Sequence, residues 1–125
     1  MYVKKMLSLK PLKPSAKEKK RYIVYGLEIK GNFDKKKMQQ QFINKLKENL
    51  GIISSAKAGI IPILIDFEIM KGILRVNHKM VDEIKANFLL ISKIGTNEVR
   101  ISSLGVSGIL KKAKENYMYK NKEEK

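Results

Sequence analysis

Residues 99–114 read V-R-I-S-S-L-G-V-S-G-I-L-K-K-A-K, and they join an alternating apolar segment to a lysine-rich one through two glycines. Its first residues alternate between apolar and polar, which is the period of a strand with one buried face. Gly105 and Gly108 follow, and glycine permits backbone angles that other residues avoid. Apolar residues then recur at helical spacing, with lysines on the other faces. The stretch therefore predicts a strand, a Gly-Ser turn and a basic helix.

A turn of this kind directs free backbone N–H groups outward at the positive end of a helix, where anions bind. The neighbouring lysines favour phosphate as the anion. An alternative stays open, because Gly-Ser turns are common: the segment could be a plain helix entry with a solvated lysine face.

Three more strands are expected upstream. Residues 21–29 alternate with period two, which assigns Ile23, Tyr25, Leu27 and Ile29 to the core. Residues 60–65 are apolar on both faces of any strand, and Pro62 cannot donate to a ladder, so this segment should be an edge strand or carry a bulge. Residues 70–77 form the third, with Leu74 and Val76 inward and Ile73 and Arg75 outward.

Two helices lie between these strands. Asp34 is a plausible N-cap for the first, whose apolar residues recur every fourth position until Gly51. Asn77 can cap the second, which has a similar apolar stripe. The resulting order is strand, helix, strand, strand, helix, strand, followed by the basic helix. This is the ferredoxin-like, or RNA-recognition-motif-like, α/β arrangement with an antiparallel sheet. The last helix or a partner would cover the sheet face that bears Tyr22, Val24 and Ile73.

The charge of the chain is its most unusual global property. Its 125 residues include 27 Lys plus Arg against 12 Asp plus Glu, a net charge of +15. A polyanion partner is therefore expected, nucleic acid before membrane. We expect a basic arm at residues 1–20, one domain at 21–119 and a charged tail at 120–125. There is no cysteine, signal peptide or membrane-spanning apolar run, which predicts a cytoplasmic protein.

Catalytic chemistry is hard to find in this sequence. His78 is the only histidine, so a His-pair metal site is excluded. Asp66 and Glu68 would share one strand face and reach a magnesium ion, although such a pair is more often a solvated strand end. No nucleotide-binding loop or nucleophile motif is present. We expect a non-catalytic chain that binds no cofactor or metal itself.

Residues 71–78, K-G-I-L-R-V-N-H, compare with the main RNA-recognition motif. Lys71, Gly72 and Val76 fit, but Ile73, Arg75 and His78 fill the aromatic positions. The fold agrees with the motif, whereas base stacking by the sheet is not expected.

Three blocks resemble the archaeal ribonuclease P protein component 2 family: Lys19–Ile23, Lys71–Val76 and, above all, Leu104–Gly108 followed by a basic helix. The resemblance implies a protein subunit of the ribonucleoprotein that removes the 5′ leader of precursor tRNA. It also implies that the RNA is the catalyst, working with Mg²⁺. The implied partners are ribonuclease P RNA, precursor tRNA, protein component 3 and other subunits. Apart from the resemblance, a homodimer stays open and no membrane contact is expected.

The candidate residues follow from charge and from this resemblance. For RNA binding we predict Lys19, Lys20, Arg21, Arg75, Ser107, Gly108, Lys111, Lys112 and Lys114. Gly105 and Gly108 would bring backbone close to phosphate. Ile60, Ile61, Ile63 and Leu64 are the candidate surface for a protein partner, unless a helix of the same chain covers them. Two other functions stay open: a general packaging or ribosomal protein, and a nuclease that uses Asp66 and Glu68.

Overall fold

The computed structural model describes residues 19–119. The expected basic arm and charged tail therefore lie outside the described residues, apart from Lys19 and Lys20. Within the described part, no helix is both long enough and apolar enough to cross a membrane.

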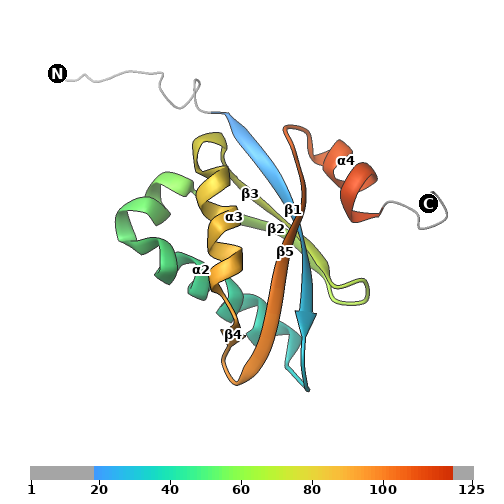
Figure 1. The fold of residues 1–125 in the computed structure, drawn as a ribbon. Helices are drawn as coiled ribbons and strands as arrows, with labels where there is room; N and C mark the ends of the chain where they lie inside the picture. The colour runs from blue at the N-terminus through green and yellow to red at the C-terminus, as the bar shows by residue number, and fades with distance from the viewer. Residues whose placement is uncertain (1–18, 120–125) are drawn as a thin grey trace.

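The fold is built on one antiparallel sheet with strand order β2-β3-β1-β5-β4 (Figure 1). Its strands are β1 (Lys20–Ile29), β2 (Ile61–Asp66), β3 (Lys71–Asn77), β4 (Lys93–Ile94) and β5 (Asn97–Ser107). The first four positions of this order are those of the predicted ferredoxin-like arrangement, which is confirmed. The short strand β4 has two residues, which are too few to show a period in the sequence.

Two helices cover one face of the sheet, which we call the α2–α3 face (Figure 1). They are α2 (Lys35–Ala58) and α3 (Val81–Leu90), the latter preceded by the 3₁₀ turn η1 (His78–Met80). The predicted inward set of β1 lies in this core, with Tyr25 packed against Phe42 and Phe88 at ring-centroid distances of 5.0 and 5.8 Å. Burial raises the pKa of the Tyr25 hydroxyl above its ordinary value, because the charged form would lose its hydration.

The ends of α2 follow its sequence signals. The Asp34 carboxylate accepts hydrogen bonds from the backbone N–H groups of Lys36 and Lys37, which confirms the N-cap. Gly51 interrupts the helix with a φ of 85°. Helical structure then resumes and ends at Gly59, which has a φ of 56°. The expected stop at Gly51 is therefore a break between two helical segments, and a second left-handed glycine ends the element.

The opposite face of the sheet, which we call the α4 face, is covered at its centre by the C-terminal segment. This segment consists of α4 (Leu110–Ala113) and the π-helical turn η2 (Lys114–Met118). Val24 and Ile73 are completely buried beneath Ala113 and Met118. The Lys71 Nζ atom donates to the carbonyl oxygens of Tyr117 and Met118, at 3.4 and 3.2 Å. The sequence left open whether the last helix or a partner covers this face. In the structure, the last helix of the chain covers its centre.

Strand β2 lies at the edge of the sheet, as Pro62 predicts. Its pairing with β3 shifts between Pro62 and Leu64, which is the bulge that the proline favours. The candidate partner surface on this strand is divided, however. Ile60 is buried in the main core, and Ile63 and Leu64 pack against the cluster under α4. Only Ile61 is openly exposed, at 46 %.

Candidate nucleic-acid interface

The predicted RNA-binding residues meet where β1 begins and where β3 and β5 end. We call this the basic end of the sheet (Figure 1). Tyr22 of β1 pairs with Arg75 of β3 on one side and with Ser107 of β5 on the other. The His78 backbone N–H donates to the Lys19 carbonyl at 2.8 Å, which ties the start of β1 to the end of β3. Antiparallel pairing thus joins cations from distant parts of the sequence.

The segment that follows β5 carries further cations near the same end of the sheet. Lys111 and Lys112 are exposed on α4, and Lys114 is half-buried at the start of η2. Gly108 lies beside Arg21, since a Cβ atom on this glycine would come within 3.4 Å of Arg21 Nη1. Leu110 packs with Tyr22 against the cluster under α4. All the cationic residues predicted for RNA binding therefore lie at or next to the basic end.

The turn before α4 differs from the sequence expectation. Strand β5 continues to Ser107, so Gly105 lies inside a strand. The Ser107 hydroxyl accepts from the Ile109 N–H and donates to the Ile109 carbonyl, both at 3.1 Å. The α-helix that follows has only four residues. The serine side chain uses the N–H of the N-cap residue Ile109, whereas no side chain caps the N–H groups of α4 itself. Anion binding at this helix start therefore stays a prediction.

Gly105 is explained by packing rather than by a turn. Neither Gly105 nor Gly108 has a positive φ. A Cβ atom on Gly105 would overlap the ring of Tyr117, which lies against the strand at this position. Because Gly105 has no side chain, the Tyr117 ring can pack directly against β5. Its predicted approach to phosphate stays a prediction that this geometry does not favour.

Electrostatics favour a polyanion at the basic end. Among residues 19–119 the ion pair found is Lys30–Glu98, at 3.6 Å, and it lies at the opposite end of the sheet. Within that range, the cations of the basic end have no carboxylate in salt-bridge distance. Unpaired cations can exchange their counterions for RNA phosphates, and the release of those counterions drives binding.

Sequence reasoning missed one residue of this site, Tyr22. It lies on the α4 face and pairs directly with Arg75. The alternation of residues 21–29 places Tyr22 on the outer face, but strand register cannot be read from a single sequence. The Nε atom of Arg75 is shielded from solvent and has no hydrogen-bond partner among the described residues.

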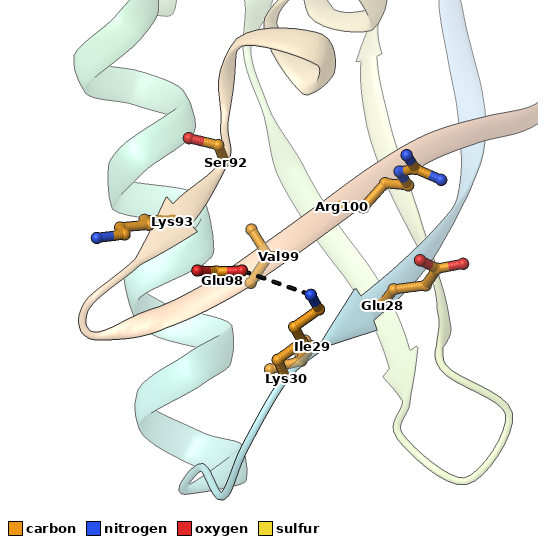
Figure 2. Close-up of a pocket in the computed structure, with 8 residues that line it drawn as sticks. All are labelled: Glu28, Ile29, Lys30, Ser92, Lys93, Glu98, Val99 and Arg100. Carbon is orange, nitrogen blue, oxygen red and sulfur yellow. Dashed lines mark ion pairs between the residues drawn. The ribbon is translucent and has the colours of Figure 1, made fainter.

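The other end of the sheet carries a pocket of about 570 Å³ with mixed charge. Figure 2 shows Glu28 and Arg100 from paired positions of β1 and β5, beside the Lys30–Glu98 ion pair. The Asn97 amide donates to the carbonyls of Lys30 and Asn32, at 2.7 and 3.0 Å, which fixes the adjoining loops. Carboxylates among the cations make this pocket a poorer site for a polyanion than the basic end.

The acidic pair considered for magnesium does not share a strand face. Asp66 ends β2, and its carboxylate accepts from the Glu68 backbone N–H at 2.9 Å, so Glu68 lies in the β2–β3 turn. Residues 19–119 contain no cluster of three or more potential metal-binding side chains of the His, Cys, Asp and Glu types. The expected shared face was wrong, because the strand ends where the carboxylate caps the turn.

The family model and the sequence relatives agree on one family. The family model described as Rpp14/Pop5 matches residues 21–118. Ribonuclease P protein component 2 of Methanococcus aeolicus is 35 % identical over 118 residues, covering 88 % of this chain and 80 % of the relative. The same component of Thermococcus gammatolerans is 32 % identical, covering 87 % and 91 %. A chain in a cryo-EM structure of yeast ribonuclease MRP aligns with a TM-score of 0.48 and 17 % identity, covering 72 % of this chain and 74 % of that one.

Proposed function

This chain belongs to the Rpp14/Pop5 family, and from that premise we propose that it is a non-catalytic protein subunit of ribonuclease P. Its task in the holoenzyme is to bind the catalytic RNA and to support removal of the 5′ leader from precursor tRNA. The Mg²⁺ ions used in cleavage are held by the RNA. We place this work in the cytoplasm, in keeping with relatives from archaea, whose cells have no nucleus.

One observation carries the proposal: the cations at the basic end have no acidic partners among residues 19–119. Packed RNA helices repel one another, and Mg²⁺ or a basic protein can screen that repulsion. A subunit of net charge +15 lowers the Mg²⁺ concentration that the catalytic fold needs. Family membership favours this role over a packaging or ribosomal function.

The test is reconstituted precursor-tRNA cleavage with two charge-matched triple variants. The first replaces Lys19, Lys111 and Lys112, which are exposed at the basic end, by alanine. The control replaces Lys45, Lys47 and Lys57, which are exposed on α2. We expect the first variant alone to need more Mg²⁺ for half-maximal rate, since both variants lose the same charge. Equal Mg²⁺ requirements for the two variants and the wild type would contradict the proposal.

The protein partners are proposed from the same family. We propose contacts with protein component 3 and other subunits, and self-association into a homodimer. Ile61 is the member of the predicted partner surface that is open to a neighbour. Ile61→Lys should weaken co-purification of another subunit if β2 forms that contact. If the same amount of that subunit co-purifies with Ile61→Lys, the contact lies on another surface.

A further inference from the structure

The C-terminal segment covers one row of the α4 face only in part. It crosses the basic end of the sheet through Ser107, Tyr22, Arg75 and Ile61, which are opposite one another on four adjacent strands. Ala113 and Met118 bury the next row, at Val24 and Ile73, while Tyr22 is only half-buried. The row therefore combines a partly open aromatic ring with a neighbouring arginine.

Arg75 has an unmet hydrogen-bonding requirement. Its Nε atom is buried and has no partner among residues 19–119. A desolvated donor without an acceptor is costly, and arginine does not lose its charge to reduce that cost. The Nε–H and one terminal N–H of a guanidinium lie on the same edge of its plane and can donate together to one acceptor group. The planar guanidinium matches phosphate oxygens in a two-pronged geometry.

Tyr22 supplies the complementary contact. Unpaired bases stack on exposed aromatic rings, whereas bases inside a duplex already stack on each other and are not available. Lys20 is two residues earlier on β1 and shares the same face, which adds a charge for the adjoining phosphate. No carboxylate pairs with Lys20, Tyr22 or Arg75 in the sheet register.

We propose that Tyr22 and Arg75 form a binding site for an unpaired RNA nucleotide, with the base stacked on the Tyr22 ring and the phosphate held by Arg75. The site rests on the proposed function and deepens it, because it specifies single-stranded RNA at one place on the basic end. Base stacking by the sheet, which the motif comparison of β3 did not lead us to expect, is thus assigned to a ring on β1.

The experiment measures binding of the full chain to an oligouridine of about ten nucleotides and to an RNA duplex of equal length, over a series of salt concentrations. Tyr22→Leu removes the ring but keeps apolar packing, and Tyr22→Phe keeps the ring. Tyr119→Leu is the matched control, since Tyr119 is 50 % exposed beyond η2. We expect Tyr22→Leu to weaken oligouridine binding by about 5- to 150-fold at each salt concentration, as removal of one stacked base does.

The salt dependence separates this site from general charge attraction. Tyr22→Leu should leave the slope of log affinity against log salt unchanged, because the ring neutralises no phosphate. The Lys19, Lys111 and Lys112 alanine variant should instead reduce the slope, by about 0.7 for each single-strand phosphate that the protein no longer neutralises. Tyr22→Phe and Tyr119→Leu should bind as the wild type does.

A second variant guards against misfolding of Tyr22→Leu. Arg75→Lys retains the charge and the strand, and should weaken oligouridine binding while duplex binding is retained. The inference is overturned if both Tyr22→Leu and Arg75→Lys bind oligouridine as the wild type does, or if they weaken duplex binding equally. In either case a reduced slope for the lysine variant would leave the proposed function standing.

Discussion

At the scale of single residues, the block Leu104–Gly108 owes its glycine to a contact far along the chain. The Tyr117 ring occupies the space where a side chain on Gly105 would lie. Glycine at this position costs conformational entropy in a strand, and the packed aromatic ring offsets that cost. The residue that most resembles a phosphate-binding glycine in the sequence therefore has a structural role in the fold.

Gly105→Ala should destabilise the protein by about 1 to 3 kcal/mol, because the new methyl group displaces the Tyr117 ring. Urea denaturation measures the loss. Gly108→Ala is the control, since its methyl group would meet only the flexible end of Arg21. The double variant Gly105→Ala, Tyr117→Ala should lose less than the sum of the two single changes. Strict additivity would show that the two residues do not depend on each other.

Tyr25 makes the stability depend on alkaline pH. Its pKa is raised by burial in the folded state, while in the unfolded chain it titrates near 10. The folded protein thus holds this proton more tightly, and its contribution to stability is complete below about pH 10 and lost as the pH rises further. We expect the wild type to lose about 1.4 kcal/mol more per pH unit above that point than Tyr25→Phe does. Parallel pH profiles for the two proteins would contradict this.

At the scale of elements, the C-terminal segment is held by side chains rather than by its own helical structure. Four α-helical residues and a π-helical turn supply few internal hydrogen bonds. The segment stays on the sheet because Ala113 and Met118 are buried and because Lys71 binds two of its carbonyls. It is therefore the element whose docking depends most on single contacts.

Lys71→Met should loosen this segment while keeping the aliphatic part of the side chain. Loss of the charged donor should cost about 1 kcal/mol of global stability, since the lysine is only half-buried. The more specific effect is local: amide hydrogen exchange should speed up over η2 and not in α2. Unchanged exchange at Tyr117 and Met118 would show that burial alone holds the segment.

The elements were largely predictable because their signals are local. The alternation of β1, the Asp34 cap and the proline of β2 each lie within a few residues, and each predicted its element correctly. Register was not predictable, since the pairing of Tyr22 with Arg75 depends on how two distant strands align. For the same reason the sequence could not show that Tyr117 covers Gly105.

For the molecule as a whole, the net charge is the property that most affects both folding and RNA binding. A net charge of +15 places many like charges on one small body, and their repulsion opposes folding. The same excess attracts RNA. Salt screens both effects, so folding and binding respond to it in opposite directions.

We expect the melting temperature of the free protein to rise as salt increases from about 0.01 M to about 0.1 M, where the screening length falls from about 30 Å to about 10 Å. Over the same range the affinity for ribonuclease P RNA should fall, with a log–log slope of about −0.9 for each phosphate contacted in a duplex region. Calorimetry and filter binding measure the two responses. A melting temperature that decreases with salt would show that ion pairs outweigh repulsion.

The cover over Val24 and Ile73 has a consequence for biosynthesis. A ribosome makes the chain from its amino end, so the cover emerges after every strand of the sheet. Until then the nascent protein exposes the apolar side chains of Val24 and Ile73, which residues 110–118 later cover. Truncation before Met118 should therefore leave a folded sheet with an exposed apolar face, and this truncated protein should self-associate.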